Sequence, residues 1–202
     1  MPENYQLLME ENLKSINSKK EKPTLLLQCC CAPCSSAVLE RLKTHFDLKI
    51  YFYNPNIYPE DEYNKRLIQF DKLLACPDFS GGIQILPAVY EPEKFDAAIK
   101  GFEDEKEGGK RCEKCFRLRL FETARKAKEI GADYFCTTLT VSPHKNADLL
   151  NKIGKKAEAE YGVKYLVSDF KKKEGYRRSI ELSKQFDLYR QNYCGCKYSI
   201  WF

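Results

Sequence analysis

The sequence predicts an α/β domain with a mostly parallel sheet. Short apolar stretches alternate with longer helical stretches along most of the chain, and this alternation is typical of strands joined by helical crossovers. We expect five strands, over residues 24–28, 47–57, 82–90, 133–141 and 164–169. Since crossover connections make successive strands parallel, the expected architecture is a single Rossmann-like (HUP-like) sandwich of three layers, followed by a cysteine-containing C-terminal extension.

The expected helices carry apolar residues at the spacing of one helical face. After the first strand, Val38, Leu42 and Phe46 recur at this spacing, and Pro33 suits the first helical turn. A long helix is expected from near Cys112. The remaining helices are expected over residues 5–16, 60–75, 92–102 and, after a turn, up to residue 161.

The length and charge of the chain limit the possible classes of protein. With 202 residues and a net charge of +5, it is long enough for one domain with a full core. We expect an N-terminal helical extension over residues 1–22 and one catalytic α/β domain over residues 23–202. There is no apolar run of membrane-spanning length and no secretory leader, which predicts a cytoplasmic protein without a membrane partner. Because thiols stay reduced in that compartment, ten cysteines indicate metal, redox or catalytic roles.

Two cysteine clusters are placed to bind a metal together. Cys29–Cys31 and Cys34 follow the first strand, at the edge where parallel sheets bind ligands. Cys112 and Cys115 lie three residues apart at a helix start, so both sulfurs share one face, and the helix N-terminus favours thiolate. Two thiolates from each cluster would make a four-thiolate site, which suits either zinc or an iron–sulfur cluster.

The remaining cysteines receive different interpretations. Cys194 and Cys196 are separated by Gly195, and such a pair can close a strained, easily reduced disulfide. The alternatives are that this pair completes a metal site, or that it is two surface thiols. Cys136, inside the fourth strand, and Cys76, at a helix end, are expected to be structural, and Cys29 receives no role.

Five segments, in order along the chain, resemble the epoxyqueuosine reductases of the QueH type. They are "CCAPC" (30–34), "YNPNIYPEDEYNKR" (53–66), "RCEKCFRLRL" (111–120), "TTLTVSPHK" (137–145) and the stretch from "DFKKKEGYRR" to "NYCGC" (169–196). The resemblance implies an oxidoreductase that reduces the epoxide of epoxyqueuosine, in the wobble position of tRNA, to queuosine. This last step of queuosine biosynthesis would use a [4Fe-4S] cluster and a nearby additional iron ion, without cobalamin.

The resemblance also implies roles for individual residues. The implied cluster ligands are Cys30, Cys31, Cys112 and Cys115, and Cys34 is a candidate ligand of the additional iron. Cys194 and Cys196 match a redox-active, catalytic disulfide, and Gln28 stands where relatives often have His. Independently of the resemblance, Lys145 and Tyr193 are our candidate proton donors, and Arg66 and Arg119 are either contacts of the nucleic acid or structural residues.

The implied partners are a tRNA that carries epoxyqueuosine and an electron donor of unknown identity. Five basic residues near the C-terminus are candidate phosphate contacts, with Tyr176 as a stacking residue: Lys171, Lys172, Lys173, Arg177 and Arg178. A charge run of this kind also occurs on ordinary solvated faces. The competing functions are a zinc-containing dithiol oxidoreductase and a zinc-stabilised RNA-binding module.

Overall fold

Five strands form one sheet in the order β3-β2-β1-β4-β5, and every neighbouring pair is parallel. The computed structural model describes residues 3–18 and 22–199. The strands are β1 (Thr24–Gln28), β2 (Asp47–Tyr51), β3 (Gln84–Leu86), β4 (Tyr134–Thr137) and β5 (Lys164–Tyr165). The Rossmann-like prediction is confirmed, and the described sheet is parallel throughout rather than mostly so.

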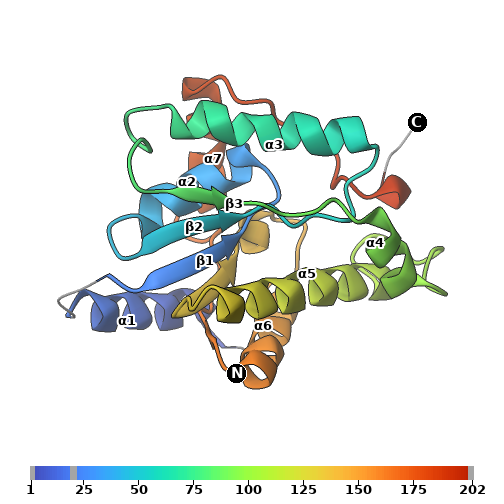
Figure 1. Cartoon of the computed structure of the whole chain (residues 1–202), viewed down its shortest axis with the longest axis horizontal. Helices are drawn as coiled ribbons and strands as arrows, with labels where there is room; N and C mark the ends of the chain where they lie inside the picture. Colours follow the sequence, from blue (N-terminus) through green and yellow to red (C-terminus); the bar gives the residue numbers. More distant parts are fainter. Residues whose placement is uncertain (1–2, 19–21, 200–202) are drawn as a thin grey trace.

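Helices cover both faces of the sheet and complete the three layers. Seven α-helices lie within the described residues: α1 (Tyr5–Asn17), α2 (Ala32–Leu42), α3 (Glu60–Leu74), α4 (Pro92–Ile99), α5 (Lys110–Glu129), α6 (Ala147–Tyr161) and α7 (Gly175–Gln185). Helices α2, α3 and α7 pack together on one face, and α5 and α6 pack together on the other (Figure 1).

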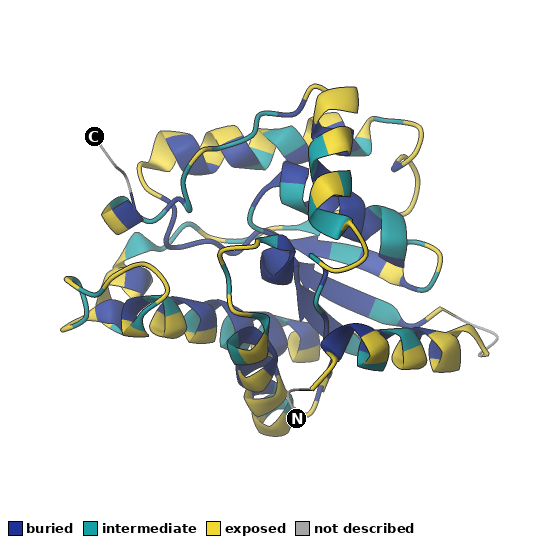
Figure 2. Ribbon diagram, turned by 180° about the vertical axis from the view of Figure 1, so that it is seen from behind, coloured by how far each residue is buried: buried dark blue, intermediate teal, exposed yellow. Residues whose placement is uncertain are grey.

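Strand β1 supplies side chains to both halves of the core. Leu25 and Leu27 belong to the apolar cluster beneath α2 and α3, whereas Leu26 points into the cluster beneath α5 and α6. Successive side chains of a strand point to opposite faces, and all three are fully buried. The strands are accordingly buried beneath helices whose outer faces are exposed (Figure 2). A central strand enclosed on both sides gives a rigid base for the residues that follow it.

The N-terminal helix is packed into the domain. Met9 and Leu13 are buried, Glu10 pairs with Arg41 of α2 at 3.4 Å, and the Tyr5 hydroxyl donates to Asp148 of α6 at 2.9 Å. Helix α1 therefore contacts helices of both outer layers. The bounds expected for the extension and for the catalytic domain include residues 1–2, 19–21 and 200–202, which lie outside the described residues.

Four of the five expected strands end earlier than the sequence predicts. The strand expected over 133–141 ends at Thr137, and Thr138–Val141 form a 3-10 helix (η1), because the Thr137 hydroxyl accepts a hydrogen bond from the Leu139 N–H at 3.1 Å. The segment expected over 47–57, which includes the Asn-Pro-Asn turn, is strand only to Tyr51, and the strands expected over 82–90 and 164–169 end at Leu86 and Tyr165. The strands therefore stop early and leave turns, loops and the η1 helix at this edge of the sheet. None of the helices in the described part of the chain is long and apolar enough to cross a membrane.

Candidate active site

The carboxyl ends of β1, β2 and β4 meet at one edge, as the parallel topology requires. Gln28, the last residue of β1, is in register with Tyr51 of β2 and with Thr137 of β4. The residues that follow these strands therefore lie beside one another. The Cys30 Sγ, for example, lies 4.0 Å from the Thr138 Oγ1.

A buried amide network supports the backbone of the cysteine turn. The Gln28 Nε2 donates to the Tyr53 carbonyl at 3.1 Å, and the Thr137 hydroxyl donates to the Gln28 Oε1 at 2.8 Å. The Asn54 Nδ2 donates to the Cys29 carbonyl at 2.8 Å, and the Asn54 Oδ1 accepts from the Arg119 Nη2 at 2.6 Å. Because these groups are buried and hydrogen-bonded to one another, they fix the turn that follows β1.

Three thiols converge above this network. The sulfur atoms of Cys30, Cys31 and Cys34 all lie within 4.8 Å of one another, and 3.8 Å separates those of Cys30 and Cys31. Two sulfurs bound at about 2.3 Å to one tetrahedral metal ion would lie about 3.8 Å apart. Cys31 caps α2, and Cys34 lies in the first turn of that helix. This thiol triad therefore has the donor chemistry and the spacing of a metal site.

Contacts within the thiol triad shift the pKa values of its members in opposite directions. Hydrogen bonds from Cys31 and Cys34 lower the pKa of Cys30, and the positive charges of Lys145 and Arg119 act in the same direction. The hydrogen bond to Cys30 in turn raises the pKa of Cys31 to about 12. The Gln191 Nε2 donates to the Cys31 sulfur at 3.0 Å.

A second group of thiols lines an adjacent cavity. Cys112 and Cys115 of α5, together with Cys194 and Cys196 of the C-terminal segment, line a cavity of about 70 Å³. The triad borders a larger cavity of about 640 Å³ through Cys30 and Cys34. Cys194 and Lys145 line both cavities. The structure thus brings the C-terminal thiols to the same edge of the sheet as the triad.

Burial outweighs the helix N-terminus at Cys112 and Cys115. Burial raises the pKa of Cys112, although the Gly108 N–H donates to its sulfur at 3.2 Å. Burial likewise raises the pKa of Cys115 to about 12, against the lowering effect of Arg119. Without a bound metal, burial therefore outweighs the lowering of the thiol pKa that is expected from the helix N-terminus.

Two cations near the sulfurs lack a carboxylate partner within residues 3–18 and 22–199. The Arg119 side chain is 1% exposed, and no carboxylate lies within ion-pairing distance of it or of Lys145. Burial opposes the charge of Lys145, but the thiols of Cys194, Cys30 and Cys34 raise its pKa. These cations can offset the negative charge that several metal-bound thiolates would bring together. The donor set and its electrostatics therefore fit an anionic metal–thiolate centre.

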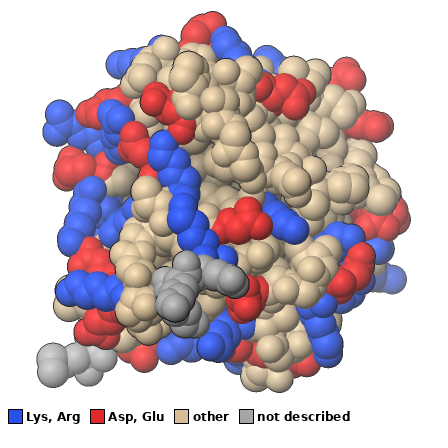
Figure 3. All heavy atoms as spheres, turned by 60° about the vertical axis from the view of Figure 1, so that its left-hand side comes forward, with Lys and Arg blue, Asp and Glu red and all other residues tan. Residues whose placement is uncertain are grey.

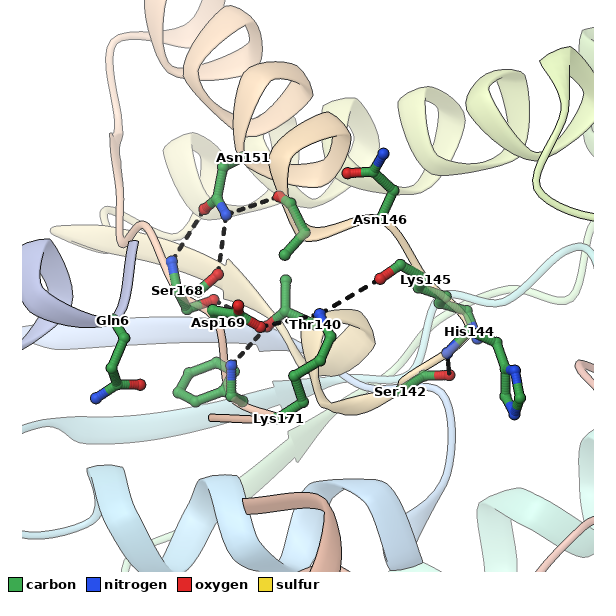
Figure 4. A network of polar contacts seen from close by, with 12 residues as sticks. Gln6, Thr140, Ser142, His144, Lys145, Asn146, Asn151, Ser168, Asp169 and Lys171 are labelled. Carbon is green, nitrogen blue, oxygen red and sulfur yellow. Dashed lines mark hydrogen bonds and ion pairs between the residues drawn. The ribbon is translucent and has the colours of Figure 1, made fainter. Parts of the chain in front are cut away.

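The segment that carries Lys145 is held by its own polar network (Figure 4). The Lys171 Nζ donates to Asp169 at 2.9 Å and to the Lys145 carbonyl at 3.4 Å, and Ser168 and Asn151 bond reciprocally at 2.9 Å. The backbone of Lys145 is thereby tied to the chain that follows β5.

Comparison with known proteins gives a consistent result. The family model described as epoxyqueuosine reductase QueH matches residues 25–201. The chain is 43% identical over 198 residues to the epoxyqueuosine reductase QueH of Streptococcus pyogenes serotype M1, covering 97% of this chain and 78% of that protein. It is 39% identical over 178 residues to the protein of the same name from Thermotoga maritima, covering 88% and 90%. The chain belongs to the epoxyqueuosine reductase QueH family.

Membership of the QueH family makes the chain an oxidoreductase, and the redox interpretation of its thiols is consistent with that class. The remaining cysteines lie away from the cavities. Cys29 and Cys136 are fully buried in the core, and the Cys76 sulfur donates to the Lys72 carbonyl at 3.3 Å at the end of α3.

Most of the basic residues near the C-terminus are paired with carboxylates. Four of the five candidate phosphate contacts form ion pairs: Lys171 with Asp169, Lys173 with Glu10, Arg177 with Glu181, and Arg178 with Glu40. Basic and acidic side chains are also interspersed on the face of the molecule shown in Figure 3. The expected cationic patch is therefore largely neutralised by its neighbours.

Sequence reasoning missed Asn54 and Gln191 and left Arg119 undecided. Asn54 follows the second strand in the Asn-Pro-Asn turn, and a polar residue at a strand's carboxyl end is a usable signal. Gln191 contacts Cys31 across 160 residues of sequence, and no local pattern indicates that contact.

Proposed function

We propose that this chain reduces the epoxide of epoxyqueuosine in tRNA to an alkene, giving queuosine. The observation that supports this most directly is the convergence of two thiol groups on adjoining cavities that share Cys194, in a chain of the QueH family. Thiols that suit a metal and thiols that suit redox exchange then lie at one edge of the sheet.

The reaction needs two electrons and two protons for each epoxide. Both C–O bonds of the epoxide break, a C=C bond forms, and the oxygen leaves as water. The dithiol of Cys194 and Cys196 can supply two electrons and two protons on forming a disulfide, and an external dithiol or one-electron reductant must then restore it. A [4Fe-4S] cluster on Cys30, Cys31, Cys112 and Cys115, with an additional iron ion at Cys34, would supply one-electron transfer and a Lewis acid.

The side chains of the larger cavity are suited to bind and protonate the substrate. Lys145 Nζ is the better of the two candidate proton donors, because the Tyr193 hydroxyl already donates to the Tyr58 carbonyl at 2.7 Å. Arg119 adds a fixed positive charge beside the thiols, which favours negative charge on a departing oxygen.

A volume of about 640 Å³ lies within the range of about 300–1,000 Å³ typical of small-molecule sites. A single modified nucleoside extruded from the anticodon loop would fit a cavity of this size. Arg190 and Tyr176 line the same cavity and form a cation–π pair, with the guanidinium 5.4 Å from the ring centroid. Such a pair offers a surface on which an unpaired base can stack.

The basic residues of the C-terminal region remain our candidate contacts for tRNA phosphates. Tyr176, at the cavity, lies between Lys171–Lys173 and Arg177–Arg178 in the chain. The ion pairs of Arg177 and Arg178 are exposed. Because exposed ion pairs contribute only about 0–1 kcal/mol, phosphate groups can replace the carboxylates that pair with these two cations.

The decisive test is anaerobic turnover of epoxyqueuosine-containing tRNA with a chemical reductant, analysed by mass spectrometry of the nucleosides. We expect queuosine to appear with the wild-type chain and not with the Cys194→Ser variant. Absence of queuosine with a metal-loaded wild-type chain would overturn the proposal.

The spacing of the triad also supports a second candidate, a zinc-containing dithiol oxidoreductase, because sulfurs 3.8 Å apart suit a single ion. Metal analysis separates the two candidates. Anaerobically purified protein that contains iron and acid-labile sulfide and is brown supports the cluster. Colourless protein with stoichiometric zinc after anaerobic reconstitution supports the alternative and also leaves open a zinc-stabilised RNA-binding module, which would show no turnover.

A further inference from the structure

The turn that carries Cys194 and Cys196 rests on a side chain of α3. The Arg66 Nη1 donates to the Cys194 carbonyl at 3.2 Å, and the Nη2 donates to the Tyr193 carbonyl at 3.4 Å. The guanidinium carbon also lies 5.1 Å from the centroid of the Tyr193 ring. One buried cation therefore makes three contacts with two successive residues of the C-terminal segment.

Arg66 is itself fixed in place. Its side chain is 1% exposed, its Nε donates to the Glu62 Oε1 at 2.7 Å, and the Tyr189 hydroxyl donates to the Glu62 Oε2 at 3.2 Å. A guanidinium has five N–H donors in a rigid planar arrangement. With one of them held by Glu62, the others are directed at the carbonyls of the turn, a geometry that the single ammonium of lysine cannot reproduce.

The turn fits closely against this guanidinium. Gly195 has a φ of +103°, and a Cβ placed on it would lie 2.8 Å from the Arg66 Nη1 and 3.0 Å from the Ile57 Cγ1. The Gly195 carbonyl accepts a hydrogen bond from the Tyr58 N–H at 2.8 Å. Both the backbone angle and the space require glycine here, so the close approach is part of how the turn is held.

We propose that Arg66, held by Glu62, is the positioning residue for the redox thiol pair. It fixes the Cys194–Gly195–Cys196 turn at the wall shared by the two cavities. Cys194 then lines both the cavity that the triad borders and the cavity that Cys112 and Cys115 line. The redox role of the pair rests on the proposed function. The positioning role rests on the contacts alone.

The test compares how fast each cysteine reacts in the anaerobically purified, reduced full-length protein. Removing Arg66 alone would leave Glu62 buried and unpaired, so we use the double variant Glu62→Gln/Arg66→Met. Each protein is treated with iodoacetamide, and the modification of each cysteine is followed by peptide mass spectrometry. We expect Cys194 and Cys196 to react at least about tenfold faster than in the wild type, while Cys76 is unchanged.

Lys72→Met is the matched control. Lys72 also lies on α3 and also contacts the C-terminal segment, with its Nζ 2.7 Å from the Asp187 Oδ2. Both side chains of this pair are exposed, and Asp187 lies seven residues before Cys194. Loss of the pair should therefore leave the alkylation rates of Cys194 and Cys196 unchanged.

Gly195→Ala tests the same contact with the ion pair intact. The added methyl group should displace the turn from Arg66 and raise both alkylation rates, even if the double variant does not fold. The proposal is overturned if Gly195→Ala, folded by circular dichroism, leaves Cys194 and Cys196 alkylated within twofold of the wild-type rate.

Alkylation is scored without any substrate, so it separates this inference from the proposed function. A released turn in the variants, together with no conversion of epoxyqueuosine by the wild type, would refute the function and retain the positioning role. If both hold, turnover should fall in the variants in parallel with the rise in alkylation.

Discussion

The two thiol groups of this protein are held in very different ways. The triad of Cys30, Cys31 and Cys34 follows a central, fully buried strand, and its backbone is fixed by the buried amides of Gln28 and Asn54. Cys194 and Cys196 lie on a segment without regular secondary structure between α7 and the short η2 helix (Lys197–Ser199), where Arg66 and the Tyr58 N–H hold the turn.

This difference in support suits the two thiol groups to different chemical roles. A metal centre needs ligands that stay in position, and rigid elements with a supporting polar shell provide this. A dithiol that alternates with a disulfide needs some freedom to change its geometry and to meet an external reductant. Each group lies on the kind of element that its proposed chemistry requires.

The largest effect on metal content and turnover is expected from removing a cysteine of the triad. Cys30→Ala removes a donor from the triad, so we expect the anaerobically purified variant to lose its bound iron and to show only background turnover. Iron, acid-labile sulfide and visible absorbance measure this loss. Cys76→Ser, away from both cavities, should retain wild-type metal content and activity. Full metal loading of the Cys30→Ala variant would exclude a triad-held centre.

A change in the C-terminal thiol pair should separate chemistry from metal binding. In Cys194→Ser no disulfide can form, so we expect unchanged iron and colour but turnover lowered by at least about a hundredfold, a barrier change of about 3 kcal/mol. Nucleoside analysis of tRNA after reaction gives the rate. Near-wild-type turnover with this variant would mean that Cys194 and Cys196 do not carry the electrons.

The Cys112→Ala variant tests whether Cys112 and Cys115 bind the metal together with the triad or act with Cys194 and Cys196. If Cys112 and Cys115 complete the cluster, Cys112→Ala should be colourless and inactive, like Cys30→Ala and unlike Cys194→Ser. Retention of both the cluster and activity would show that our ligand assignment is wrong. Visible absorbance and acid-labile sulfide measure the cluster in this variant, as they do for Cys30→Ala.

Loss of the amide network that supports the triad should lower the free energy of unfolding. Asn54→Ala leaves Arg119 without its buried acceptor and removes one of the two donors to the Cys29 carbonyl, which we expect to lower the free energy of unfolding by about 1–3 kcal/mol. Urea unfolding of the metal-free protein measures this. Asn64→Ala, on the exposed side of α3, should change it by less than about 0.5 kcal/mol. Equal values for the two variants would argue against the network.

The smallest effect concerns the docking of α7 onto α2. A hydrogen bond from Arg178, at 2.8 Å, lowers the pKa of Glu40 below its ordinary value of 4.5. The pair therefore stabilises the fold above pH 4.5, and this contribution is lost as the pH falls through the lowered value. Because both side chains are over a third exposed, we expect Arg178→Met to lower stability by at most about 1 kcal/mol at neutral pH. The difference should shrink as the pH falls through the lowered pKa of Glu40 and vanish below it; a difference that persists in fully protonated protein would have another origin.

Much of the fold was accessible from local sequence patterns. The position of each strand, the helices between them and the cysteine turn after β1 follow from apolar spacing and turn residues, which act over a few neighbours. Helix α7 was not predicted, because of its residues only Ser179, Leu182 and Ser183 are buried, and it is stabilised by packing against α2. The ends of β2, β3, β4 and β5 were misplaced for a related reason, since hydrogen bonds to other segments decide where a strand stops.

The sequence by itself determined the α/β class, the thiols available for chemistry and, through the resemblance of five ordered segments, the family. The tertiary structure alone decided that Cys194 faces both cavities, that Gln191 contacts Cys31, that carboxylates neutralise most of the basic run, and that Arg66 holds the C-terminal turn. The physical reason is the sequence separation of the residues that interact. Helical and strand periodicity report on residues a few positions apart, whereas these contacts join residues more than a hundred positions apart and depend on how the finished sheet and its helices pack.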